Sequence, residues 1–71
     1  MMSAQTQENY RTQLNKLEST AIRSPDAAIQ SIYAIEDELS HELDPYAQKI
    51  LARAHILYGI ALLMRRSHDV K

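Results

Sequence analysis

Residues 44–66 read DPYAQKILARAHILYGIALLMRR, and this stretch decides how the chain folds. Apolar residues recur in it at alternating steps of three and four, which is the spacing of one face of an α-helix. The residues on this face are Ala47, Ile50, Ala54, Leu57, Ala61 and Met64. Because small alanines alternate with larger side chains, a second helix can approach closely and interdigitate with them. The stretch therefore predicts a long helix that packs against a neighbouring helix.

The same helix carries more apolar surface than one neighbour can cover. Residues 56–64 are apolar on every side of the helix. A helix of this kind is expected to be buried all round, and a chain of 71 residues offers little else to bury it. The sequence therefore predicts a helical protein partner, and a homo-oligomer when the protein is alone.

Composition limits the class of protein. The chain contains no Cys, which excludes disulfides and cysteine-based zinc or redox sites and is compatible with a reducing compartment. Its 8 basic and 9 acidic residues give a net charge of -1. Nucleic acid and anionic membranes are therefore not the expected partners. The apolar run around Tyr58 is shorter than the roughly 18–20 residues needed to span a bilayer, so no membrane insertion is expected.

Two prolines divide the chain into helices. Ser24-Pro25 and Asp44-Pro45 are typical helix starts, because the residue before Pro is kept out of the helical region and Pro is favoured at the first helical position. The Ser and Asp side chains can accept the free amide hydrogens of the first turn. We therefore expect one small all-α domain over residues 1–71. Its predicted helices span residues 5–22, 25–43 and 45–66. The last two form an antiparallel hairpin, and a short N-terminal helix is added to it.

The residues that most often carry chemistry do not form a catalytic or metal site. Glu38-x-x-His41 has the spacing of half a carboxylate-bridged metal site, but the second half is missing. His55 lies among apolar residues and is more typical of a packed or rim histidine than of a base. A glycine inside a helix lowers the stability of that helix relative to alanine. We therefore expect Gly59 to serve another purpose, which is to permit close contact with a neighbouring helix. No catalytic residue, cofactor or metal ligand is predicted, and the protein is not expected to be an enzyme.

The third predicted helix has to present one face to the second helix and another to a partner. Close antiparallel packing needs small residues, so the line of Ala47, Ala54 and Ala61 is expected to face the helix over residues 25–43. The basic C-terminal end of the third helix is a candidate for orienting a partner. The predicted partner-binding residues, which lie away from the alanine line, are Leu51, Tyr58, Leu62 and Arg65.

A family resemblance gives these predictions a biological setting. The segments that carry it are Tyr46-Ala47-Gln48, Ala54 and Gly59-Ile60-Ala61-Leu62-Leu63. This pattern resembles the YscE-like small co-chaperones of bacterial type III secretion needle subunits, over roughly residues 28–70. The resemblance implies a helical hairpin that pairs with a larger tetratricopeptide-type chaperone. It also implies that the pair keeps the needle protein soluble in the cytoplasm.

Two alternatives remain open at this point. Asp26-Ala27-Ala28-Ile29 resembles the opening of the second helix of a tetratricopeptide repeat, and one such unit cannot bury its own faces. This weaker resemblance also implies a helical partner. A different class of function is a small dimeric helical regulator in which Arg65 and Arg66 touch nucleic-acid phosphates. The net charge of the chain argues against that function.

Overall fold

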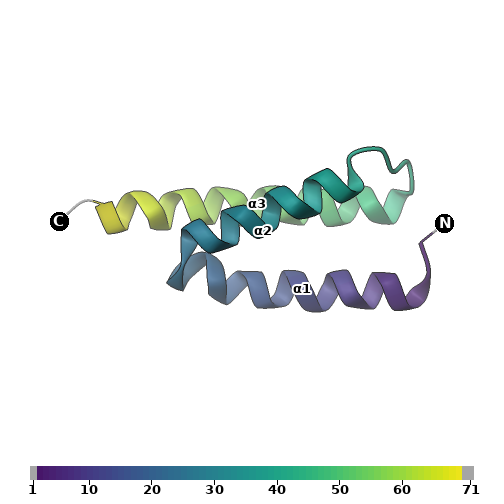
Figure 1. Cartoon of the computed structure of the whole chain (residues 1–71), viewed down its shortest axis with the longest axis horizontal. Coiled ribbons are helices and arrows are strands. Elements are labelled where there is room, and N and C mark those ends of the chain that lie inside the picture. Colours follow the sequence, from purple (N-terminus) through teal and green to yellow (C-terminus); the bar gives the residue numbers. More distant parts are fainter. Residues whose placement is uncertain (1, 70–71) are drawn as a thin grey trace.

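The structure is a computed structural model that describes residues 2–69. Three helices occur in this range and no strand, namely α1 (Ala4–Arg23), α2 (Pro25–Leu39) and α3 (Pro45–Asp69). Figure 1 shows that α1 and α3 run in the same direction and that α2, which crosses α3 in this view, runs in the opposite direction. The Cα atoms extend over 46 × 19 × 14 Å, so the bundle is elongated. The predicted all-α hairpin with an added N-terminal helix is confirmed.

The first helix begins at a side-chain cap and ends at a residue shared with the second helix. Oγ of Ser3 accepts the backbone N–H of Thr6 at 3.1 Å, which satisfies a free amide of the first turn. At the other end, the N–H of Ser24 donates to the carbonyl of Thr20 at 2.7 Å, and its own carbonyl accepts the N–H of Ala28 at 3.1 Å. Ser24 thus caps α2 through its backbone alone, and the prediction that its side chain caps this helix was wrong.

The second helix ends at Leu39 rather than at residue 43 as predicted. The predicted boundaries left only Asp44 between two antiparallel helices, whereas such a connection takes about 2–5 residues. Residues 40–44 form this connection. Oδ1 of Asp44 accepts the N–H of Tyr46 at 2.8 Å and so caps α3 as the sequence predicted. At its other end α3 continues to Asp69, past the predicted end at residue 66.

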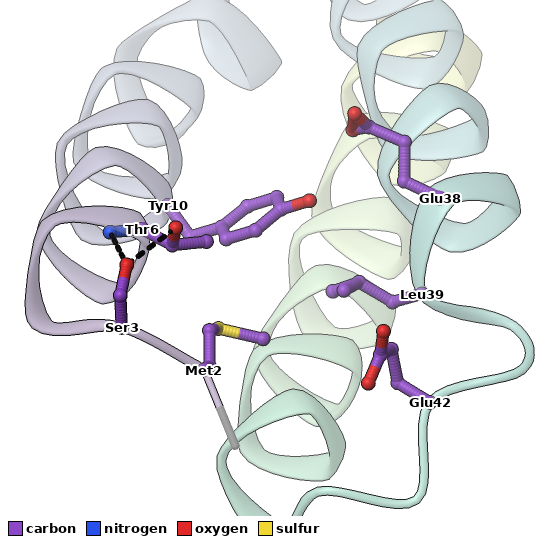
Figure 2. A pocket seen from close by; sticks show the side chains of 7 residues that line it. All are labelled: Met2, Ser3, Thr6, Tyr10, Glu38, Leu39 and Glu42. Atoms are coloured by element: carbon purple, nitrogen blue, oxygen red, sulfur yellow. Dashed lines mark hydrogen bonds between the residues drawn. The ribbon is translucent and has the colours of Figure 1, made fainter.

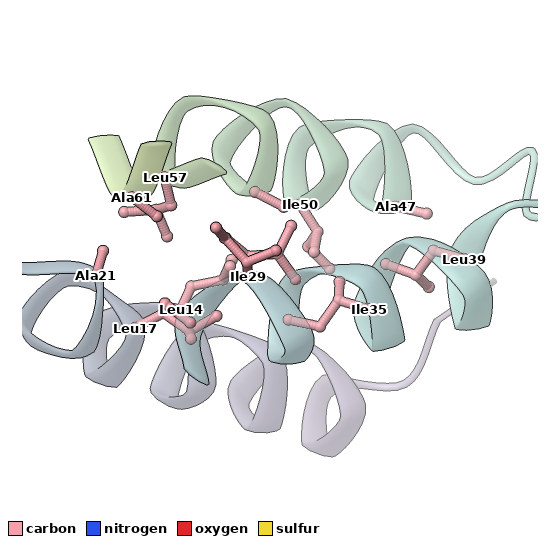
Figure 3. Packing of buried hydrophobic residues seen from close by; sticks show 13 residues of the cluster. Leu14, Leu17, Ala21, Ile29, Ile35, Leu39, Ala47, Ile50, Leu57 and Ala61 are labelled. Carbon is pink, nitrogen blue, oxygen red and sulfur yellow. The ribbon is translucent and has the colours of Figure 1, made fainter. Parts of the chain in front are cut away.

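The core is a single cluster to which all three helices contribute (Figure 3). Each helix contacts both of the others, and the hairpin of α2 and α3 has the most extensive interface. No buried side-chain nitrogen or oxygen within residues 2–68 lacks a hydrogen-bond partner. The hydrophobic residues buried in this cluster are Leu14, Leu17, Ala21, Ala28, Ile29, Ile32, Ile35, Leu39, Ala47, Ile50, Ala54, Leu57 and Ala61.

The alanine line of α3 is buried as predicted. Ala47, Ala54 and Ala61 are fully inaccessible to solvent, and Ile50 and Leu57 lie beside them in the core. Met64 at the end of this line is only partly buried. The line packs against α1 as well as α2, because Leu14, Leu17 and Ala21 of α1 belong to the same cluster. The N-terminal helix therefore covers part of the apolar surface of α3.

Candidate functional site

The His, Asp and Glu side chains were the candidates for a metal site. Among the residues that the structure describes, no three His, Cys, Asp or Glu side chains gather as metal ligands would. His41 lies exposed in the connection that follows α2. His55 is two-thirds exposed on α3, where its Nε2 lies 4.0 Å from a carboxylate oxygen of Glu36. This is a rim position, as the sequence indicated.

A polar hollow of about 450 Å³ opens between the start of α1 and the end of α2 (Figure 2). The ring of Tyr10 reaches from α1 toward α2, which carries Glu38. Partial burial, followed by the nearby carboxylates of Glu38 and Glu42, raises the pKa of Tyr10 above its usual value. The phenol of Tyr10 is therefore harder to ionise than a phenol in water. The residues that line the hollow are Met2, Ser3, Thr6, Tyr10, Glu38, Leu39 and Glu42.

The predicted partner-binding residues lie on the side of α3 that borders α2. Leu51 and Tyr58 are half-buried and pack against the core cluster. Leu62 is 40% exposed. Nε of Arg65 lies 3.4 Å from a carboxylate oxygen of Asp26 at the start of α2. The structure therefore brings these four residues to one edge of the hairpin, although two of them already serve its packing.

A tyrosine pair explains why Tyr58 belongs partly to the hairpin. Its hydroxyl lies 3.2 Å from the hydroxyl of Tyr33 on α2, and the two rings are tilted with their centroids 5.8 Å apart. Hydrogen bonding to Tyr58 raises the pKa of Tyr33. The pair bridges α2 and α3 at the surface, so a change at Tyr58 affects the contact between the two helices as well as any partner.

A second apolar surface lies on the side of α3 that faces away from α2, and the sequence analysis did not single it out. We call it the outer apolar face. Ile56, Ile60 and Leu63 follow steps of four and three along one side of α3, and Ile22 of α1 lies beside Ile56 and Ile60. An open hollow of about 430 Å³ between α1 and α3 has Ile22, Ile56 and Ile60 in its walls. The exposed fractions of the four side chains are 55% for Ile22, 65% for Ile56, 37% for Ile60 and 65% for Leu63.

Gly59 lies within this outer apolar face, and its surroundings correct a prediction. A Cβ atom added at Gly59 would meet no atom of the described structure within 4 Å, apart from its immediate helical surroundings. The glycine therefore permits no close helix contact inside this chain, contrary to the expectation from the sequence. It leaves a shallow point on the surface between Ile56 and Leu63.

Charges are segregated between the helices of the hairpin. The sequence of α2 contains four acidic residues and neither Lys nor Arg. The sequence of α3 contains four Lys or Arg residues and one acidic residue, which is its last. Arg53 of α3 crosses to α1, where its guanidinium donates to Asn15 at 2.8 Å and pairs with Glu18. The basic residues of the hairpin therefore lie on α3, and two of them, Arg53 and Arg65, are paired with carboxylates of α1 and α2.

Comparisons with models of protein families, with curated proteins and with solved structures gave no match. Over the described residues, no helix combines the length and the apolar character required to cross a membrane.

Proposed function

We propose that this protein is a non-catalytic binding subunit that completes its core against a larger helical protein. The observation that carries the proposal is the outer apolar face, where four large aliphatic side chains on neighbouring helices are 37–65% exposed. Single exposed apolar residues are normal on protein surfaces, but a contiguous group of them on a small domain marks an interaction site.

The finer proposal is a co-chaperone role. A subunit that pairs with a tetratricopeptide-type chaperone would help to shield a type III secretion needle protein from aggregation in the cytoplasm. The support for this setting is the sequence resemblance described above, together with an all-α hairpin of the expected kind. Apolar association of this sort is driven by removing the exposed side chains from water, at about 25 cal/mol per Å² of apolar surface.

Affinity capture tests the general proposal. The tagged full-length protein is expressed in its native cells, and the proteins that co-purify with it are identified. We expect a helical protein at a fixed stoichiometry, and a tetratricopeptide-type protein if the finer proposal is right. Analytical ultracentrifugation of the protein alone complements this experiment, because an unpartnered apolar face favours weak homo-oligomers. A monomer that binds no hydrophobic dye and captures no protein would contradict the proposal.

A second candidate function is a small dimeric regulator that binds nucleic acid. The four basic residues of α3 favour it. Two of them are already partnered, because Arg53 pairs with Glu18 and Arg65 with Asp26. Electrophoretic mobility of a DNA duplex at low salt separates the two functions, since binding through phosphates would be strong and would weaken steeply with added salt.

A further inference from the structure

The outer apolar face has the spacing that helix recognition requires. Its anchors on α3, Ile56, Ile60 and Leu63, recur at four and then three residues, so they lie along one side for about two turns. An amphipathic helix presents its own apolar anchors at steps of three and four, so its seam can match this row of side chains. Gly59 lies among them with open space where a side chain would be, so the backbone of a bound helix can approach closely there.

Basic residues border this face at both ends. Arg53 lies three residues before Ile56 on α3, and Arg66 lies three residues after Leu63. Arg23 follows Ile22 in the last turn of α1. One carboxylate, that of Glu18, lines the hollow and partly neutralises Arg53. The acidic helix α2 contributes no residue to the hollow.

We propose that the outer apolar face binds an amphipathic helix of another protein whose apolar seam is flanked by Asp or Glu residues. This inference rests on the proposed function and names the surface and the chemistry of the partner. Carboxylates on either side of the seam would meet Arg66 at one end and Arg23 beside Ile22. Complementary charges of this kind select the partner and its orientation more than they add affinity.

A second copy of this chain fits the outer apolar face less well than an acid-flanked helix does. Two copies that pair through it would bring α3 against α3. The basic residues that border the face are Arg23, Arg53 and Arg66, and the hollow contains one carboxylate, that of Glu18, which already pairs with Arg53. Like charges placed opposite each other across an interface oppose binding. Added salt screens this repulsion, so self-association through the face should increase with salt. Binding of an acid-flanked helix should decrease with salt.

The test uses the full-length protein and two synthetic helical peptides with the same seam of Leu and Ile, one flanked by Glu and one by Lys. Fluorescence anisotropy measures binding at low salt and at about 0.5 M NaCl. We expect the Glu peptide to bind on the order of tenfold more tightly, and the difference to shrink in high salt. Leu63→Asp should abolish binding. The matched variant Leu43→Asp, at a leucine that is 92% exposed in the connection before α3, should leave it unchanged.

A charge reversal completes the test. The double variant Arg23→Glu with Arg66→Glu should lose the preference for the Glu peptide and gain one for the Lys peptide. Equal binding of the two peptides by the wild type would overturn the inference, as would binding that survives Leu63→Asp. Salt-enhanced self-association that competes with the peptide would assign the face to a second copy. Binding to anionic lipid vesicles that is lost in Leu63→Asp, without any peptide preference, would assign it to a membrane surface.

Failure of this inference can be told apart from failure of the proposed function. If wild type and Leu63→Asp capture the same native partner equally well, the protein is a binding subunit that uses another surface. If the Glu peptide binds as expected and no native protein is captured, the chemistry of the face is right and the proposed function is wrong.

Discussion

The backbone N–H of Met2 donates to Oδ2 of Asp44 at 2.7 Å, which ties the chain before α1 to the start of α3. The other carboxylate oxygen of Asp44 caps α3 by accepting the N–H of Tyr46 at 2.8 Å. One side chain thus stabilises the start of α3 and holds the N-terminal segment beside it. Since α1 covers part of the alanine line, this contact helps to decide how much of α3 remains available to a partner.

Replacement of Asp44 should loosen both contacts. We expect Asp44→Ala to lower the melting temperature measured by circular dichroism at neutral pH, because it removes the cap and the bond to Met2 together. Asp44→Asn keeps one acceptor oxygen and should lower the melting temperature less than Asp44→Ala does. Asp37→Ala is a matched control, since Asp37 is exposed and its side chain accepts no hydrogen bond within residues 2–68. Equal melting temperatures for Asp44→Ala and Asp37→Ala would show that these contacts do not stabilise the fold.

The contribution of Asp44 should depend on pH. The hydrogen bonds from the backbones of Tyr46 and Met2 hold the pKa of Asp44 below its ordinary value of 3.8. A carboxyl whose pKa is depressed by folding stabilises the fold fully above its unfolded pKa, and this stabilisation is lost as the pH falls through the folded pKa. The difference in melting temperature between wild type and Asp44→Asn should therefore be largest near neutral pH and should disappear in strong acid. A difference that grows as the pH falls would have the wrong sign.

Overpacking the alanine line should damage the bundle. Ala54 is fully buried where α3 meets its neighbours, so Ala54→Leu forces extra methyl groups into a packed core. We expect a loss of roughly 1–3 kcal/mol in the free energy of unfolding, measured with urea. Ala34→Leu, on the exposed side of α2, is the matched control and should change stability little. Similar stabilities for the two variants would indicate that the packing around Ala54 is loose.

Replacement of Gly59 should change the stability of the free protein and its binding of a helix in opposite directions. The residue lies inside α3 with an ordinary helical backbone and open space at the Cβ position. Gly59→Ala should therefore stabilise the isolated protein by about 1 kcal/mol, because Ala favours the helix. The same variant should weaken binding of the Glu-flanked peptide if a helix passes close to this point. Destabilisation of the free protein would mean that the Cβ position is already occupied.

Two neighbouring leucines distinguish the two candidate surfaces of α3. Leu62 lies on the edge predicted from the sequence, next to the tyrosine pair, and Leu63 lies on the outer apolar face. We expect Leu63→Asp to abolish capture of the native partner and Leu62→Asp to reduce it only modestly. Both variants should remain helical, because both side chains are substantially exposed. The reverse order of effects would move the site to the edge formed by Leu51, Tyr58, Leu62 and Arg65.

Tyr58→Asp should behave differently from both leucine variants. The half-buried ring packs against the core and its hydroxyl contacts Tyr33. We therefore expect this variant to lower the melting temperature of the isolated chain, whereas Tyr58→Phe, which removes only a surface hydroxyl contact, should have a much smaller effect. An unchanged melting temperature in Tyr58→Asp would show that the tyrosine pair contributes nothing to the hairpin.

The helices and the core were predictable from the sequence alone, because they depend on local spacing and on the chemistry of single residues. The alternating steps along residues 47–61 identified the buried side of α3, and Asp44-Pro45 identified where it begins. The prediction of a side-chain cap failed at Ser24, whose carbonyl serves instead. The end of α2 was also predicted wrongly, because the length of the connection depends on where two distant helices meet.

Only the tertiary structure decided which of the apolar residues around α3 remain exposed. Residues 56–64 are apolar on every side of the helix. The spacing of apolar residues therefore cannot distinguish the side that faces the core from a side that faces a partner. The position of α1 resolves this ambiguity, since it brings Leu14 and Leu17 against the alanine line and leaves Ile22 beside Ile56 and Ile60. The placement of α1 depends on contacts between residues far apart in the chain, such as Arg53 with Glu18 and Met2 with Asp44, and no local pattern encodes them.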